Sequence, residues 1–311
     1  MLRIHIPQTV PPLKRADWLA NFKLATQRTG RLMMLAGDQK IEHLNNDFVG
    51  AGIAPDDGSP EHLFQIASQA RVGALAAQLG LIAAWGDSYR RVPYIIKLNS
   101  KTALIPASQA DPTSGLLTTI AQAADFKKSS HLKVVGVGLT IYPGAASEAA
   151  QLSTAGQVIT EARQHGLLTV LWAYPRGRAI KDETDARLIA GMTGLAASLG
   201  ADFVKVNYPR HADKDNLAAI IAAAGRTGVI FSGGKLLDPK AFLKLLALQI
   251  ASGARGNATG RNLHQRPLAE SVRLAQAISA ISLNNASAEE AYKIFTNRAG
   301  SAKAWRFKRL R

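Results

Sequence analysis

Short apolar runs alternate with longer helix-like segments along most of this 311-residue chain. Eight runs predict buried strands, at residues 32–37, 74–79, 92–98, 134–142, 168–174, 201–207, 229–233 and 254–260. Helical spacing of apolar residues predicts helices at 147–164, 182–199, 213–224, 239–250 and 267–281. Strands that alternate with helices form parallel sheets, and eight such units close into a barrel. The sequence therefore predicts an α/β fold, a single (β/α)8 TIM barrel.

An open, doubly wound sheet is the alternative fold. It is disfavoured because no Gly-x-Gly-x-x-Gly turn follows the first predicted strand, as a dinucleotide-binding sheet would have. The run at 74–79 is rich in alanine and also compatible with a helix, and the stretch 101–133 has no clear assignment.

Three parts of the chain differ in pattern. Residues 1–30 predict an N-terminal helical extension, with Trp18 and Phe22 at helical spacing, and residues 31–285 predict the barrel. Residues 286–311 predict a C-terminal helix and a basic tail. Residues 45–60, rich in glycine, proline and aspartate, predict a long loop after the first strand, and such loops often act as lids.

Composition excludes several kinds of chemistry. The chain is 47% hydrophobic and 19% charged, which is typical of a globular protein, and it contains no cysteine. Disulfides, thiolate nucleophiles, thiolate zinc sites and iron–sulfur clusters are therefore excluded. No apolar run approaches the roughly 20 residues that span a bilayer, and the first residues lack the apolar core of a signal peptide. We expect a cytoplasmic location without membrane association.

The net charge of +16, from 38 basic and 22 acidic side chains, favours anionic partners. A phosphorylated metabolite is one such partner, and a nucleic acid is the alternative from a different functional class. The one dense basic cluster is in the tail, at Lys303, Arg306, Lys308, Arg309 and Arg311, and its simplest interpretation is a solvated or subunit-facing segment. No nucleic-acid-binding motif is present, so nucleic acid is the less favoured partner.

Reactive side chains stand where the predicted strands end, which is the rim that carries the active site in barrels of this kind. In the run 201–207, a period of two places Lys205 and Phe203 on the face opposite Val204 and Val206. Lys205 then points into the barrel, where burial favours the neutral, nucleophilic amine that imine chemistry requires. Equally, Lys205 could neutralise a buried carboxylate such as Asp38.

Trp172 and Tyr174 are two residues apart and therefore share a face, and a phenol beside an imine can exchange protons with a substrate. Packing in the core is the more common role of an aromatic side chain in a strand. Asp38 ends the first strand, where its carboxylate could position a hydroxyl or move a proton, although capping the next helix is more common.

Two glycine turns follow the last two predicted strands. They contain Ser232, Gly233 and Gly234 in one turn, and Gly260 with Arg261 in the other. Glycine lets backbone amides approach an anion, and the loops after these strands frequently bind phosphate in this fold. The guanidinium of Arg261 adds a charged fork that suits phosphate oxygens.

A metal site is not expected. The seven histidines show no paired spacing such as His-x-x-x-His, which disfavours a zinc-dependent aldolase or hydrolase. The residues at the strand ends call for no cofactor.

Seven segments agree in order and spacing with one known family. They are Gly-Asp-Gln-Lys-Ile-Glu-His at 37–43, Ile-Lys-Leu-Asn at 96–99, Leu-Thr-Ile-Tyr-Pro-Gly at 139–144, Trp-Ala-Tyr-Pro-Arg-Gly at 172–177, Ala-Asp-Phe-Val-Lys-Val-Asn-Tyr at 201–208, Ser-Gly-Gly at 232–234 and Thr-Gly-Arg-Asn at 259–262. In these segments the chain resembles the archaeal-type class I fructose-bisphosphate aldolases, which also occur in bacteria.

The resemblance implies that Lys205 forms the Schiff base, Tyr174 is the acid and base, and Asp38 assists at the sugar hydroxyls. It also implies that Trp172 lines the substrate and that Gly233, Gly234, Gly260 and Arg261 hold the phosphate. Lys97, also in a strand, would be a nearby cation that depresses the pKa of Lys205 or holds a substrate oxygen. The family further implies a homo-oligomer, often a decamer of two pentameric rings.

The expected reaction is the reversible cleavage of fructose 1,6-bisphosphate to dihydroxyacetone phosphate and glyceraldehyde 3-phosphate. The alternative within the family is a related phosphoketose aldolase, synthase or thiolase. Two departures bear on this choice: Gln39 stands where the family often has histidine, and the loop 45–60 is longer than usual. Both features border the sugar-binding side.

Overall fold

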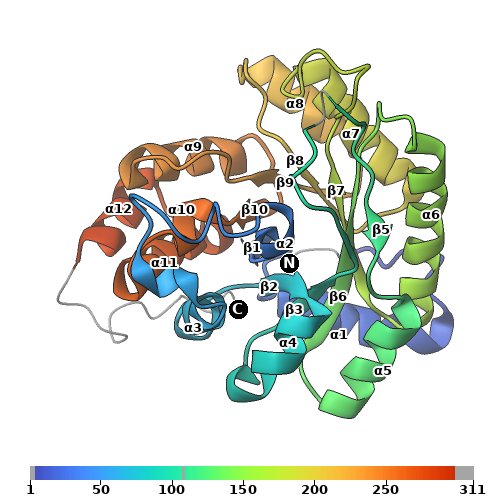
Figure 1. The fold of residues 1–311 in the computed structure, drawn as a ribbon, viewed down its shortest axis with the longest axis horizontal. Helices are drawn as coiled ribbons and strands as arrows, with labels where there is room; N and C mark the ends of the chain where they lie inside the picture. The colour runs from blue at the N-terminus through green and yellow to red at the C-terminus, as the bar shows by residue number, and fades with distance from the viewer. Residues whose placement is uncertain (1–3, 107–108, 298–311) are drawn as a thin grey trace.

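Eight parallel strands close into a barrel in a computed structural model, which describes residues 4–106 and 109–297 (Figure 1). The strands are β1 (Leu32–Ala36), β2 (Ala74–Gln78), β3 (Tyr94–Lys97), β6 (Val134–Ile141), β7 (Leu168–Ala173), β8 (Phe203–Val206), β9 (Gly228–Ser232) and β10 (Gly256–Thr259). Around the barrel they run β1-β10-β9-β8-β7-β6-β3-β2. The predicted (β/α)8 barrel is confirmed, and the alanine-rich run forms the fully buried strand β2.

Helices that follow the strands along the chain cover the outside of the barrel. They are α3 (Glu61–Gln69), α4 (Leu79–Trp85), α5 (Ile120–Ser130), α6 (Glu148–Gln164), α7 (Ala186–Leu199), α8 (Lys214–Ala223), α9 (Pro239–Ala251), α11 (Leu268–Asn284) and α12 (Ala288–Thr296). Helix α7 begins four residues later than its sequence pattern predicts, because the side chain of Asp185 accepts hydrogen bonds from the backbone of Arg187 and Leu188 and starts the helix there.

Short elements complete the two ends of the barrel. They are the α-helices α2 (Gln39–Glu42) and α10 (Arg261–His264), the 3-10 helices η1 (Pro12–Lys14), η2 (Pro55–Gly58) and η3 (Gly86–Tyr89), and the strands β4 (Asn99–Ser100) and β5 (Gly115–Leu116). The unassigned stretch 101–133 thus contains β5, which pairs antiparallel with β4, followed by α5 with a capping box at Thr119.

The strands divide their side chains between two cores. Val204 and Val206 pack in the outer core between the sheet and the helices, whereas Phe203 and Trp172 belong to the core inside the barrel. This division confirms the predicted alternation along β8 and places Lys205 on the inner side.

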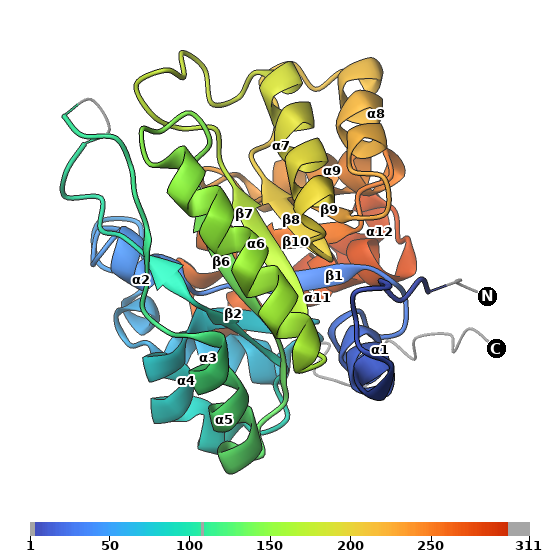
Figure 2. The same ribbon diagram turned by 90° about the vertical axis from the view of Figure 1, so that its right-hand side faces the viewer.

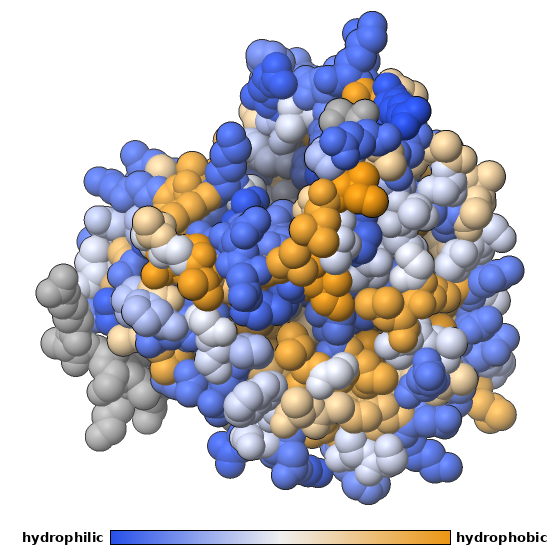
Figure 3. Space-filling model, in the orientation of Figure 1, coloured by the Kyte–Doolittle hydropathy of each residue, from blue (hydrophilic) through white to orange (hydrophobic). Residues whose placement is uncertain are grey.

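Helix α1 (Arg15–Ala25) closes the N-terminal end of the barrel. Trp18 is buried in the inner core, and its ring stacks on Phe22, which in turn stacks on Phe203. Figure 2 shows α1 and α2 at opposite ends of the molecule. The C-terminal ends of the strands therefore lie on the face that carries α2, where hydrophilic residues gather beside a hollow (Figure 3).

No helix in the described ranges is long and apolar enough to cross a membrane. The basic cluster of the tail, from Lys303 to Arg311, lies outside the described residues.

Candidate active site

Lys205 lies in β8 with 5% of its surface exposed, paired in register with Trp172 of β7. Its Nζ is 5.3 Å from the centre of the Trp172 ring, and it forms no hydrogen bond or ion pair with another described residue. Burial lowers the pKa of Lys205, the charges of Asp38 and Glu42 raise it in part, and Arg261 lowers it further. Lys205 therefore forms no direct ion pair with Asp38 among the described residues, although the charge of Asp38 acts on it.

Lys97 lies on the neighbouring side of the same indole, with its Nζ also 5.3 Å from the Trp172 ring centre. Unlike Lys205, it donates hydrogen bonds to the backbone oxygen of Asn99, at 2.8 Å, and to its side-chain oxygen, at 3.1 Å. Burial lowers the pKa of Lys97 to about 8, and the charge of Lys205 lowers it while Asp38 and Glu42 raise it. Two hydrogen bonds thus hold the Lys97 amine in place, whereas the Lys205 amine has no hydrogen-bond partner among the described residues.

Trp172 lies close to both lysines and is only 1% exposed. Its ring lies against Gly138 of β6, where an added Cβ would come within 2.2 Å of the Trp172 ring. Glycine at this position therefore leaves the space that the indole of Trp172 occupies.

Tyr174 follows β7 directly and is partly buried beside the inner core. Burial raises the pKa of Tyr174 well above its ordinary value, and the charges of Asp38 and Glu42 add to this effect. The phenol is therefore protonated at neutral pH. The structure brings Tyr174 into the same electrostatic environment as Lys205.

Asp38 is buried at the end of β1 and precedes helix α2, but its side chain makes no capping hydrogen bond. Its Oδ1 is buried without a partner among the described residues. An ionisable oxygen left unpaired in the interior is costly unless a ligand or water satisfies it. The side chain of Asp38 therefore does not cap helix α2, which is the more common role for an aspartate at this position.

Glu42, Tyr142 and Arg176 were not assigned roles from the sequence, although each lies in a segment that carries the family resemblance. The Tyr142 hydroxyl donates to Glu42 Oε1 at 3.4 Å, and Arg176 Nη1 lies 3.6 Å from the same oxygen. Glu42 acts on the pKa of both buried lysines and of Tyr174. In the sequence, the one signal for a role of Glu42 is its position in the segment 37–43, which carries the family resemblance.

The two glycine turns meet, as expected for a phosphate site. Arg261 Nη2 donates to the Gly234 oxygen at 3.1 Å, and the Asn262 amide donates to the Gly233 oxygen at 2.9 Å. Asn262, which the sequence analysis left without a role, thus ties the two turns together. Ser232 ends β9 beside them, and a Cβ at Gly260 would lie 2.4 Å from Gln39 Oε1, so a side chain there would displace Gln39.

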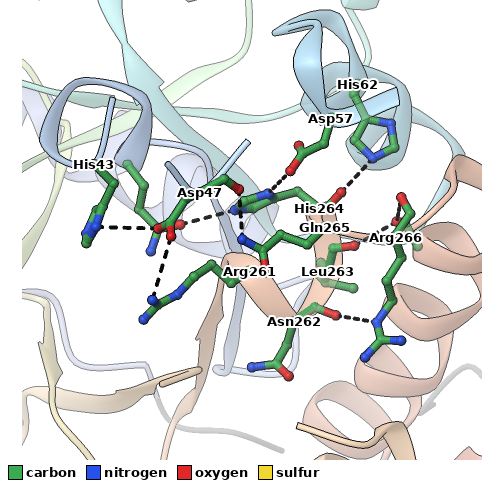
Figure 4. Close-up of polar contacts among 12 residues, drawn as sticks. His43, Asp47, Asp57, His62, Arg261, Asn262, Leu263, His264, Gln265 and Arg266 are labelled. Carbon is green, nitrogen blue, oxygen red and sulfur yellow. Dashed lines mark hydrogen bonds and ion pairs between the residues drawn. The ribbon is translucent and has the colours of Figure 1, made fainter. Parts of the chain in front are cut away.

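Buried contacts join the loop 45–60 to the segment that contains α10 (Figure 4). Asp57 Oδ2 is 2.6 Å from His264 Nδ1, and both side chains are fully buried. His264 also stacks on Phe48 and lies 3.2 Å from Gln39 Oε1. Gln265 and Asp47 add a further hydrogen bond between this loop and α10. The loop therefore fixes the position of α10 and, through His264, that of Gln39.

No group of three or more His, Cys, Asp or Glu side chains suited to a metal ion occurs in residues 4–106 and 109–297. The site contains two lysines, carboxylates and phenols. Amines are suited to Schiff-base formation, and carboxyl and phenol groups are suited to proton transfer.

Comparison with known proteins agrees with this geometry. The family model described as DeoC/LacD family aldolase matches residues 32–266. The chain belongs to this aldolase family. A relative from Methanocaldococcus jannaschii, named fructose-bisphosphate aldolase/6-deoxy-5-ketofructose 1-phosphate synthase, is 51% identical over 94% of each chain.

Solved structures of aldolases superpose on the whole barrel. A fructose-bisphosphate aldolase from Slackia heliotrinireducens is 46% identical over 97% of each chain, with a TM-score of 0.94. An archaeal fructose-1,6-bisphosphate aldolase, with its catalytic lysine covalently bound to the carbinolamine intermediate, is 29% identical over 86% of this chain and all of that one, with a TM-score of 0.74. The resemblance to class I fructose-bisphosphate aldolases is confirmed, and the chain is an aldolase of that family.

Proposed function

We propose that this aldolase is a metal-independent lyase in which Lys205 forms a Schiff base with the ketone of a ketose 1-phosphate. The observation that carries the proposal is the buried amine of Lys205, which has a lowered pKa and no partner among the described residues. The lowered pKa favours the neutral amine, the form that attacks a carbonyl carbon, whereas Lys97 is held by Asn99 and Lys235 is exposed.

The reaction would proceed as follows. Lys205 Nζ adds to the C2 carbonyl, and the carbinolamine loses water to give an iminium. The C3–C4 bond then breaks as the C4 hydroxyl loses its proton, and the bonding electrons pass into the iminium to form an enamine. After the aldehyde leaves, C3 takes a proton, and water releases the ketone product and regenerates the amine.

Tyr174 is assigned the proton at the C4 oxygen. Its raised pKa makes the phenol the resting form, which donates a proton to that oxygen when the aldol bond forms. In the cleavage direction the phenol must first pass its proton to a neighbouring carboxylate, and Asp38 and Glu42 both act on it. The turns containing Gly233, Gly234, Gly260 and Arg261 would bind the phosphate at C1.

The proposed substrate is fructose 1,6-bisphosphate, cleaved reversibly to dihydroxyacetone phosphate and glyceraldehyde 3-phosphate. Relatives named fructose-bisphosphate aldolase support this assignment.

The 51% identical relative favours a second candidate, the synthase reaction in its name. Division of 6-deoxy-5-ketofructose 1-phosphate at its C3–C4 bond gives dihydroxyacetone phosphate and 2-oxopropanal. The same Lys205 enamine would therefore serve both reactions, and only the aldehyde would differ. Gln39, which stands where the family often has histidine, lies beside Gly260 in the turns assigned to the C1 phosphate.

Borohydride reduction in the presence of dihydroxyacetone phosphate tests the mechanism. We expect one adduct per chain, mapped by peptide mass spectrometry to Lys205, and no adduct in Lys205→Met. An adduct on Lys97 or Lys235, or full activity in Lys205→Met, would overturn the mechanism.

Parallel assays distinguish the two reactions. Release of glyceraldehyde 3-phosphate from the bisphosphate reports cleavage, and consumption of 2-oxopropanal in the presence of the bisphosphate reports the synthase reaction. Adduct formation without either activity would retain the Schiff base and reject both proposed substrates.

A further inference from the structure

A cavity of about 710 Å³ opens at the end of the barrel opposite the candidate active site. Residues 4–9 and α1 form one wall, and the segments that precede β8, β9 and β10 form the other. This volume lies within the range typical of small-molecule sites. The N-terminal face of such barrels ordinarily serves stability, so an open cavity there is unexpected.

Cations dominate the rim of this cavity. Arg226 Nη1 lies 2.8 Å from His5 Nε2, and since a guanidinium only donates, His5 accepts with a neutral ring nitrogen. The Arg255 side chain has no hydrogen bond or ion pair among the described residues and is exposed. Neighbouring Arg31 has its pKa lowered by burial and by the charge of Arg255, so these guanidiniums repel each other.

The one carboxylate among the described residues that line the cavity does not offset these charges. Asp202 accepts hydrogen bonds from the Thr169 amide, at 2.8 Å, and the Thr169 hydroxyl, at 3.1 Å. It also lies 4.0 Å from Arg163, which is itself 6% exposed and has a buried Nε without a partner in the described ranges. Among the described residues, no carboxylate pairs with Arg226 or Arg255.

We propose that this cavity binds a diphosphate group, as free diphosphate or as part of a nucleoside diphosphate. Two guanidiniums on one rim offer bidentate donors to two phosphoryl groups. The wall beside them contains the stacked rings of Trp18, Phe22 and Phe203, an apolar surface suited to the rest of a nucleotide. A recess with localised charge favours a small anion over a nucleic-acid strand, which needs an extended basic surface.

Isothermal titration calorimetry with inorganic pyrophosphate tests this site on the full chain. All variants carry Arg261→Gln, which weakens anion binding at the catalytic end and keeps the two sites apart. We expect Arg226→Gln/Arg255→Gln to weaken pyrophosphate binding by about tenfold or more. The loss of one hydrogen bond between charged groups is enough to reduce affinity by about that factor. The matched control is Lys128→Gln/Lys244→Gln, which removes two exposed positive charges on α5 and α9.

Unchanged affinity in the arginine double variant, an equal loss in the lysine control, or no saturable binding in the Arg261→Gln background would each overturn the proposal. Thermal unfolding of every variant, together with the single substitutions Arg226→Gln and Arg255→Gln, separates loss of binding from loss of fold. Titration with ADP then identifies the source: tighter binding of ADP than of pyrophosphate indicates a nucleotide, and equal affinity indicates free diphosphate. This site does not depend on Lys205 chemistry, so its failure leaves the proposed function standing.

Discussion

Asp38 carries a charge that acts on both buried lysines without pairing with either. Its carboxylate raises the pKa of Lys205 and of Lys97, because a negative charge stabilises the ammonium form. Asp38→Asn removes that charge and keeps the shape of the side chain. The pKa of Lys205 should then fall, and the pH profile of borohydride trapping should move towards lower pH.

This prediction concerns the trapping step alone, which keeps it separate from any role of Asp38 at the substrate hydroxyls. An unchanged profile, or one displaced to higher pH, would show that the charge of Asp38 does not control the amine. Asp87→Asn, on an exposed surface pair, is the control and should leave the profile unchanged.

Tyr174 gives a second prediction at the same scale. Tyr174→Phe keeps the ring and removes the hydroxyl, so the imine at Lys205 should still form while cleavage slows by about 100-fold or more, the usual scale for loss of an acid or base. Stopped-flow cleavage and borohydride trapping measure the two steps on the same sample. Tyr292→Phe on α12 is the control, and near-normal cleavage in Tyr174→Phe would return this residue to a packing role.

Helix α10 and the loop 45–60 form a unit through the buried pair of Asp57 and His264. Asp57→Ala leaves His264 Nδ1 without its hydrogen-bond partner in the interior, and an unsatisfied buried polar group costs about 1–3 kcal/mol. We expect a loss of that size in the free energy of unfolding measured with urea. Phosphate binding should also weaken, because α10 carries Arg261.

A surface pair provides the comparison for this prediction. Asp87 and Arg90 form an exposed ion pair, and exposed pairs contribute about 0–1 kcal/mol. Asp87→Ala should therefore change stability little. Equal losses in Asp57→Ala and Asp87→Ala would contradict the view that the loop 45–60 is a buried support for α10.

For the whole molecule, family resemblance predicts a homo-oligomer. Large apolar side chains are exposed on the single chain, among them Leu13 at 93%, Leu104 at 71% and Ile105 at 62%. Multi-angle light scattering at physiological salt should give a mass that is an integer multiple of the monomer mass. A monomeric mass across a hundredfold concentration range would contradict this prediction.

Local periodicity was enough to predict the barrel, because strand and helix spacing are properties of neighbouring residues. The period of two along β8 also placed Lys205 inside and Val204 and Val206 outside, as the structure confirms. The two glycine turns were also predicted from neighbouring residues, and they placed Gly233 and Arg261 at the ends of adjacent strands. These inferences needed only residues close in the chain and the known closure of eight βα units.

Only the tertiary structure decided which distant side chains meet. Glu42 and Tyr142 are 100 residues apart, and Asp57 and His264 are 207 apart, so no local pattern predicts either contact. The unengaged amine of Lys205, the shared indole between the two lysines and the cavity at the opposite end also arise from closure of the barrel. Burial and long-range charge depend on the packed interior, and the one-dimensional sequence does not contain those distances.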